Sequence, residues 1–173
     1  MPVTYLRKVQ ADELDQVVEI IEEAKQVLKG RGVDLWQDGY PDQKILRSDI
    51  QRGIAYFLIK DDKIAGVAAL EDQGEASYDQ IEDGSWSPKS QERYAIFHRV
   101  AIAQGHQGEG LASVFIQHLL SITASLNIHD VRIDTHFDNL AMQHVIEKNG
   151  FQKCGTIRDA QQRPLVAYQR FIR

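Results

Sequence analysis

Three glycines, Gly105, Gly108 and Gly110, fall between an apolar stretch and a helical pattern. The stretch 94–102 is apolar and branched enough for a buried strand. The residues after the turn predict a helix with one apolar stripe: Leu111, Phe115, Leu119, Ile122 and Leu126. A helix that begins after a glycine turn offers unpaired N–H groups and the positive end of its dipole, and glycine lets a ligand approach closely. The pattern therefore predicts a phosphate site, and particularly a pyrophosphate site.

The order of the glycines excludes two common phosphate sites. A P-loop requires Gly-Lys followed by Ser or Thr, and the chain contains no such sequence. A dinucleotide-binding fingerprint reads Gly-x-Gly-x-x-Gly and follows the first strand of its unit. Residues 105–110 read Gly-x-x-Gly-x-Gly and come after the middle of the chain.

Two signatures in this part of the chain resemble those of the GNAT acyltransferases, which bind acetyl-CoA. The run Gln107-Gly108-Glu109-Gly110-Leu111-Ala112 resembles the Gln/Arg-x-x-Gly-x-Gly/Ala signature of that family. The second signature is an Asn that opens a later helix ending in Gly-Phe, and Asn139 to Gly150-Phe151 has this spacing. Together they cover about a third of the chain, 94–151. The competing interpretation is a glycine turn that only caps a helix.

The resemblance implies a set of cofactor contacts. The main chain of Gln107, Gly108, Glu109, Gly110, Leu111 and Ala112 would hold the pyrophosphate. Val100 and Ile102 would pair with the pantetheine arm, in a gap between strand 94–102 and its splayed neighbour 129–136. A main-chain N–H near 98–100 would polarise the thioester carbonyl. Asn139 would contact the cofactor from the next helix.

Acetyl transfer also requires a base, because an amine with a pKa near about 10 must lose a proton before it attacks. Glu71 ends a predicted strand. His98 lies on strand 94–102, and alternation places three residues on its face: Tyr94, Ile96 and Val100. Asp134 and His136 share one face at the end of the next strand. Glu71, His98 and His136 are the candidate catalytic residues, and Asp134 is a weaker candidate. Each of the four could instead be a hydrogen-bonded residue at a strand end.

One position departs from the family. Many GNAT enzymes carry a Tyr seven residues after the Asn, as general acid for the leaving thiolate, and this position is Ile146 here. A thiol with a pKa of about 8.5 leaves acceptably without full protonation. Water, His144 or His136 are alternatives. Cys154 has no electropositive sequence context, so we expect a structural role and no acyl-enzyme intermediate.

Trp36 and Tyr40 are large aromatic residues in the turn-rich segment 33–41. They could form a wall of the substrate site or plug the edge of the core, and the GNAT resemblance favours the substrate wall. The connection 72–92 is long and polar, and no Lys or Arg occurs in 64–88. Its acidic residues are either a solvated loop or a negative rim that attracts an amine.

The elements that must position these residues alternate along the chain. We expect strands at 4–9, 55–60, 63–71, 94–102, 129–136, 151–157 and 164–172, with a tight turn at Asp61-Asp62. We expect helices from Asp12 to about Gly30, over 41–52, from Leu111, and from Asp138 or Asn139 through Lys148. This order predicts an α/β fold. The sheet would be mixed and mostly antiparallel, with helices on both faces, as the GNAT resemblance also implies.

Composition limits the remaining possibilities. The chain has 173 residues, 43% of them hydrophobic, a net charge of −5 and one cysteine. We therefore expect a single domain, 1–173, with its own core and without a disulfide. The acidic charge argues against a nucleic-acid partner, and no apolar run is long enough for a membrane or a secretion signal. The histidines show no metal-ligand spacing, so we expect no metal, and we expect a cytoplasmic location.

Two functions of different classes follow. The first is an N-acetyltransferase that moves an acetyl group from acetyl-CoA to a small primary amine by direct attack in a ternary complex. The second is a CoA-binding sensor or interaction module with little catalysis, which Ile146 motivates. A structural domain without cofactor is a third possibility. The amine stays open, and homodimerisation through a sheet edge is possible.

Overall fold

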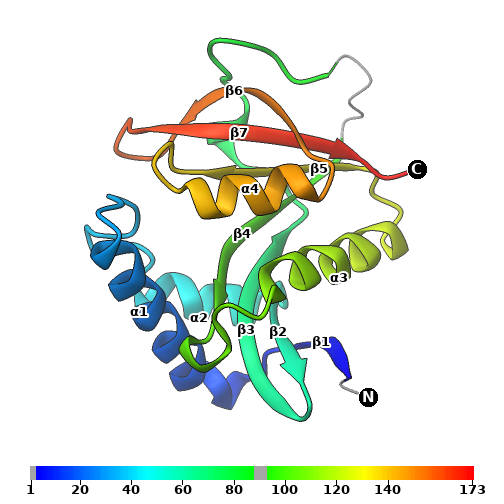
Figure 1. Ribbon diagram of the computed structural model, residues 1–173. Coiled ribbons are helices and arrows are strands. Elements are labelled where there is room, and N and C mark those ends of the chain that lie inside the picture. Colours follow the sequence, from blue (N-terminus) through cyan, green and yellow to red (C-terminus); the bar gives the residue numbers. More distant parts are fainter. Residues whose placement is uncertain (1–2, 88–92) are drawn as a thin grey trace. The chain divides into compact units, whose positions relative to one another are not determined.

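A computed structural model of the chain describes residues 3–87 and 93–173. Its seven strands lie in the order β1-β2-β3-β4-β5-β7-β6 (Figure 1). The strands are β1 (Thr4–Lys8), β2 (Ala55–Lys60), β3 (Lys63–Glu71), β4 (Tyr94–Ile102), β5 (Asp130–Thr135), β6 (Gln152–Arg158) and β7 (Pro164–Phe171). The helices are α1 (Leu14–Gly30), α2 (Gln43–Gln51), α3 (Leu111–Ser125) and α4 (Leu140–Lys148). Short 3-10 turns are η1 (Ala11–Glu13), η2 (Ala76–Tyr78) and η3 (Gln104–His106).

The pairing confirms the predicted fold class. β4 and β5 are parallel, whereas the pairs β1–β2, β2–β3, β5–β7 and β6–β7 are antiparallel. The β4–β5 register covers three pairs, Tyr94–Ile96 with Asp130–Arg132, and β4 runs on to Ile102.

The chain divides into two compact units. Unit 1 comprises residues 1–70 and 99–118, and unit 2 comprises 71–98 and 119–173. Both β4 and α3 contribute residues to each unit. The single domain 1–173 stays a prediction, and each unit is described by itself.

In unit 1, helices cover both faces of the sheet. Val17, Ile21 and Leu46 from α1 and α2 join a buried cluster with Phe57 and Val67 of the strands. The opposite face is held close to α3 by Gly66. A Cβ at Gly66 would lie 2.8 Å from the carbonyl oxygen of Ala101 and 3.2 Å from the side chains of Ile102 and Phe115.

In unit 2, the two faces are covered differently. Tyr168 of β7 donates a hydrogen bond to Glu147 of α4, 3.1 Å, so α4 lies over that face. The other face packs Ile96 and Ala167 against Tyr78. Residues 76–86 therefore cover this face instead of a long helix.

The connection after β3 corrects one expectation. We predicted a polar loop over 72–92, but Tyr78 is 1% exposed and Trp86 stacks on it, with ring centroids 5.5 Å apart. Further along, residues Glu82 to Ser85 bond to the edge of β6, including both Glu82–Thr156 main-chain bonds at 2.8 Å. The part of this prediction that falls on 88–92 lies outside the described residues.

Two smaller corrections concern the ends of the first and third long helices. The first helix begins at Leu14 after the η1 turn, instead of at Asp12. Leu126 lies beyond the end of α3 and is 40% exposed, so the apolar stripe stops before it. β7 lies between β5 and β6, so the last strand of the chain is not at the sheet edge.

Candidate active site

The glycine turn, residues 105–110, adopts the backbone that a ligand cradle needs. Gly108 and Gly110 have positive φ angles of 78° and 72°, which an L side chain rarely adopts. A Cβ at either position would meet no atom within 4 Å. Gly105 has no positive φ and equally open surroundings, so neither backbone nor space explains a glycine there.

The first turn of α3 follows directly. Val114 N donates to Gly110 O, 3.5 Å, so the amides of Leu111 and Ala112 precede the first hydrogen bond inside the helix. At the start of the turn, Gln104 N donates to the Glu23 carboxylate, 3.1 Å. The turn thus presents main-chain donors from an anchored position, and these residues fit the pyrophosphate of acetyl-CoA.

Glu109 is the one acidic residue within the turn, and its charge is balanced. Its carboxylate accepts from Lys60 Nζ at 2.9 Å and lies 3.2 Å from His106 Nδ1. The hydrogen bonds from Lys60 and then His106 lower the pKa of Glu109. A neighbouring cation therefore offsets the repulsion that this carboxylate would exert on a phosphate.

The end of β4 carries the predicted pantetheine contacts. Ile102 O accepts a hydrogen bond from Gln107 Nε2, 3.0 Å, and a carbonyl oxygen has capacity for a second bond. Arg99 has a φ of 52° in the middle of this strand. A left-handed residue interrupts strand alternation, so the expected common face of His98 and Val100 does not follow.

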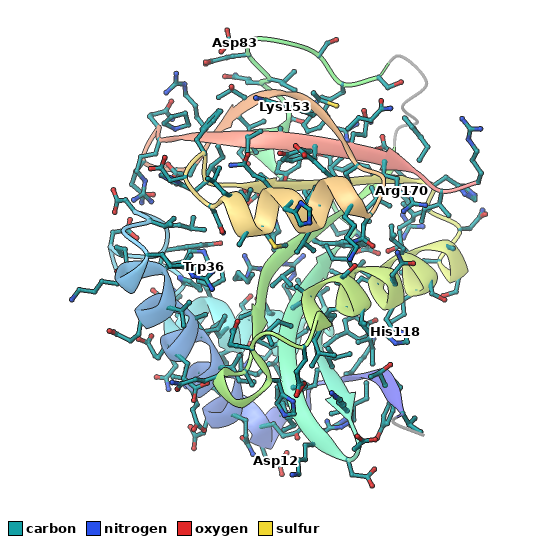
Figure 2. The ribbon with its side chains drawn as sticks, viewed as in Figure 1. Asp12, Trp36, Asp83, His118, Lys153 and Arg170 are labelled. Carbon is teal, nitrogen blue, oxygen red and sulfur yellow. The ribbon has the colours of Figure 1, made fainter. Side chains whose placement is uncertain are left out.

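The two aromatic residues of segment 33–41 lie differently. Trp36, labelled in Figure 2, packs against the buried cluster of α1, α2, β2 and β3. Tyr40 Oη accepts a hydrogen bond from Arg99 Nη1, 2.9 Å. The Arg99 guanidinium also donates two bonds to Asp49, 2.7 and 2.8 Å.

Unit 2 contains the candidate bases, and His98 is the most enclosed imidazole among them. Its side chain is 13% exposed, and Nε2 lies 3.0 Å from a carboxylate oxygen of Glu75. The two atoms are not aligned for a hydrogen bond, so Nε2 is buried without one. The ring meets Tyr78 edge-on, with centroids 6.3 Å apart.

Tyr78 connects this group to β5. Its hydroxyl donates to Asp134, 2.5 Å. Burial, followed by the nearby Asp134 charge, raises the pKa of Tyr78 well above its usual value, so the phenol stays neutral and remains the donor. We call His98, Glu75, Tyr78 and Asp134 the His98 cluster.

The other predicted side chains have partners of their own. Glu71 is 6% exposed and accepts from Gln73 N, 3.1 Å. His136 Nδ1 accepts from Asp138 N, 3.0 Å. Asn139 is the N-cap of α4: its carbonyl oxygen accepts from Met142 N, 3.3 Å, and its amide donates to Thr135, 3.2 Å.

Ile146 is fully buried in α4. The position of the usual Tyr is therefore part of the core, while His144 on the same helix is exposed. Cys154 is partly buried, and burial raises the pKa of its thiol, with Arg132 lowering it and Asp130 raising it. A raised pKa keeps the thiol protonated, as expected for a structural cysteine.

The sequence did not single out Glu75 and Tyr78 of the His98 cluster, nor Arg99 and its partner Asp49. Glu75 and Tyr78 fall in the segment that looked solvated. An aromatic residue among acidic ones was the available signal for Tyr78. Asp49 and Arg99 carried no signal, because the sequence does not reveal that the backbone turns at residue 99.

Comparison with known proteins identifies the family. A model of the Acetyltransferase (GNAT) family matches residues 14–151. The chain belongs to the GNAT acetyltransferase family. A GNAT acetyltransferase from Streptococcus agalactiae is 35% identical, over 98% of this chain and 96% of that one, with a TM-score of 0.88. Among curated proteins, none matches the chain.

More distant GNAT structures share the fold. A structure of the aminoglycoside acetyltransferase AAC(6')-Ib with coenzyme A and kanamycin is 16% identical over 98% of this chain and 95% of that one, with a TM-score of 0.71. This GNAT protein is thus an acetyltransferase, and acetyl-CoA is the co-substrate of its family. Among residues 3–87 and 93–173, no helix is long and apolar enough to cross a membrane.

Proposed function

We propose that this acetyltransferase moves an acetyl group from acetyl-CoA to a small primary amine, by direct attack in a ternary complex. The observation that carries the proposal is the glycine turn. Its left-handed Gly108 and Gly110 open into free space directly before the first turn of α3. Main-chain donors at a helix N-terminus suit a pyrophosphate.

In this proposal, the main chain of residues 107–112 holds the pyrophosphate, and Val100 and Ile102 pair with the pantetheine arm. Asn139, which caps α4, contacts the cofactor from the start of that helix in this proposal. A main-chain N–H within 98–100 faces the thioester carbonyl, where negative charge develops during attack.

His98 is the base that the geometry favours. A buried imidazole beside a carboxylate can take a proton from the amine, because the carboxylate stabilises the imidazolium that forms. The amine nitrogen then forms its bond to the carbonyl carbon, and the carbon–sulfur bond breaks. The thiolate, with a pKa of about 8.5, leaves without a Tyr donor. Glu71 and His136 are the remaining candidates.

The acceptor is proposed from the surrounding charge. Glu71, Glu75 and Asp134 are three carboxylates of unit 2, and acidic side chains around a site attract a cationic amine. Trp36 and Tyr40 are proposed as the aromatic wall of the acceptor site. A structural neighbour that binds kanamycin, itself an amine, supports this substrate class.

Calorimetry with acetyl-CoA tests the cradle on the wild type, on Gly108→Asp and on a matched control. Gly32→Asp is that control, since Gly32 has a φ of 72° and equally open surroundings but lies after α1. We expect the wild type and Gly32→Asp to bind and Gly108→Asp to lose binding at least tenfold. Equal binding by all three proteins would show that the turn is only a helix cap.

A CoA-binding sensor is the second candidate, because buried Ile146 removes the usual acid. CoA release from acetyl-CoA across a panel of polyamines, aminoglycosides, amino acids and peptides separates the two. Turnover above the hydrolysis background supports the enzyme. Tight binding without turnover on any amine supports the sensor.

A cytoplasmic location and a homodimer are also proposed, and neither depends on the site. Segment 82–85 bonds to part of the β6 edge, so β1 is the edge that we propose for pairing.

A further inference from the structure

Arg99 holds an unusual backbone conformation in the middle of β4. Its φ of 52° lies in the left-handed region. A non-glycine residue in this region is strained and persists only where its surroundings hold it. Such breaks in a strand redirect the peptide groups beside them and are common next to active sites.

The surroundings of Arg99 explain why the conformation persists. Its side chain is 10% exposed, and that of Asp49 is 7% exposed. Nε and Nη2 donate to the two carboxylate oxygens of Asp49 at 2.7 and 2.8 Å, while Nη1 donates to Tyr40 at 2.9 Å. We call these three residues the Arg99 network.

The guanidinium of Arg99 stays positively charged within the network. Burial alone would lower the pKa of Arg99, but Tyr40 and Asp49 outweigh burial and raise it. A guanidinium is a rigid planar fork, so two parallel bonds to a carboxylate fix its orientation as well as its position. The side chain therefore fixes the backbone of residue 99 from α2 and from segment 33–41.

We propose that Arg99 is a positioning residue for acetyl transfer. The Arg99 network holds the left-handed turn of β4, and this turn aims a main-chain N–H within 98–100 at the thioester carbonyl. Asp49 and Tyr40 act through Arg99. This inference rests on the proposed function, because it needs acetyl-CoA to lie along β4.

For Tyr40, this positioning role is an alternative to the substrate wall proposed above, and kinetics distinguish the two. If its hydroxyl acts by holding Arg99, its loss weakens carbonyl polarisation and slows transfer to every amine by the same factor. If it contacts the acceptor, the loss depends on which amine is used.

The experiment compares wild type with Tyr40→Phe, Asp49→Asn and the control Glu13→Gln. Glu13 forms a two-bond pair with Arg7 in the same unit, both at 2.8 Å, and lies outside the network. Each protein is assayed for acetyl-CoA affinity by calorimetry and for kcat with two unrelated amines. Difference infrared spectroscopy with carbonyl-labelled acetyl-CoA reports the carbonyl band of the bound thioester.

For Asp49→Asn we expect kcat to fall about 10- to 100-fold, equally for both amines, because an oxyanion donor is displaced instead of removed. Its affinity for acetyl-CoA should change less than about threefold, since the pyrophosphate contacts remain. The carbonyl band should move toward that of free acetyl-CoA. Tyr40→Phe should shift kcat and the band in the same direction by less, and Glu13→Gln should change neither.

An unchanged carbonyl band in both network variants would overturn the proposal, as would a loss that differs between the two amines. Tyr40→Phe removes one oxygen atom only, so it decides the question if Asp49→Asn does not fold. Wild-type protein that fails to bind acetyl-CoA would refute the proposed function itself. If acetyl-CoA binds but its carbonyl band is the same in the wild type and the network variants, only the role of Arg99 is refuted.

Discussion

Nε2 of His98 lies 3.0 Å from a carboxylate oxygen of Glu75; the His98 side chain is 13% exposed and that of Glu75 is 44% exposed. In the described part of the chain, the other two candidate bases lack such a pairing of an imidazole with a carboxylate from another segment. Glu71 accepts a bond from the main chain of Gln73, and His136 uses Nδ1 to accept from Asp138. Among the candidate bases, His98 is the imidazole that lies next to a carboxylate of another segment.

We therefore predict that His98→Gln lowers kcat/KM about 10²- to 10⁴-fold, the range for loss of a general base. Glu75→Gln should lower it less, because a neutral amide still fills the space but no longer stabilises an imidazolium. Steady-state kinetics with saturating acetyl-CoA measure both. A kcat/KM near the wild-type value in His98→Gln would show that Glu71 or His136 is the general base instead.

Also at the residue scale, the Arg7–Glu13 pair predicts a dependence of stability on pH. The hydrogen bond from Arg7 lowers the pKa of Glu13. A lowered pKa stabilises the fold above the unfolded pKa of about 4.3 and loses that effect as the pH falls through the folded pKa. Glu13→Gln should thus cost about 0.5–1 kcal/mol at pH 7 and progressively less below pH ~4. Urea unfolding at both pH values measures this, and an equal cost at both would contradict it.

At the scale of elements, segment 72–87 is fastened to the sheet by aromatic residues. The guanidinium of Arg132 lies 4.3 Å from the ring centre of Trp86 and 3.8 Å from that of Tyr94. Trp86 Nε1 donates to Tyr78 O, 2.8 Å. The same segment carries Glu75, so the packing of Trp86 helps to place the partner of His98.

Trp86→Ala should lower the free energy of unfolding by about 2–3 kcal/mol, less than the usual cost for a fully buried ring, because Trp86 is partly buried. It should also lower kcat, because Glu75 loses its support. Phe137→Ala is the control, since Phe137 is 39% exposed and makes a cation–π contact with Lys153. Chemical unfolding followed by circular dichroism compares the two. Equal losses would contradict the role of Trp86.

The strands show what sequence patterns can predict. β2, β3 and β4 have the bounds expected from their apolar runs and from the Asp61-Asp62 turn. The chain turns there through two consecutive left-handed residues, with φ of 48° and 64°. Sequence patterns predict these strands and this turn because the residues that determine each element lie within it.

The candidate site was less predictable because its decisive contacts are distant in sequence. Gly108 and Gly110 could be selected from spacing, since glycine turn geometry is local. The bonds of Arg99 to Asp49 and Tyr40 span 50 and 59 residues. No periodic pattern reports such contacts, and strict alternation along β4 concealed the turn at Arg99.

At the scale of the whole molecule, binding of acetyl-CoA should raise the free energy of unfolding. A ligand that binds the folded chain at 100 times its Kd adds about 2.7 kcal/mol. For 173 residues this corresponds to a rise in Tm of about 5–11 °C. Differential scanning calorimetry with acetyl-CoA should show the rise for wild type and Gly32→Asp and no rise for Gly108→Asp.

Gly66 has a consequence for the engineering of cofactor affinity. It sets the distance between the sheet and α3, since a Cβ there would meet Ala101, Ile102 and Phe115 at 2.8–3.2 Å. A single added methyl group would act as a spacer under the helix whose first turn is proposed to bind the pyrophosphate. We therefore expect Gly66→Ala to change the affinity for acetyl-CoA from a buried position in the sheet.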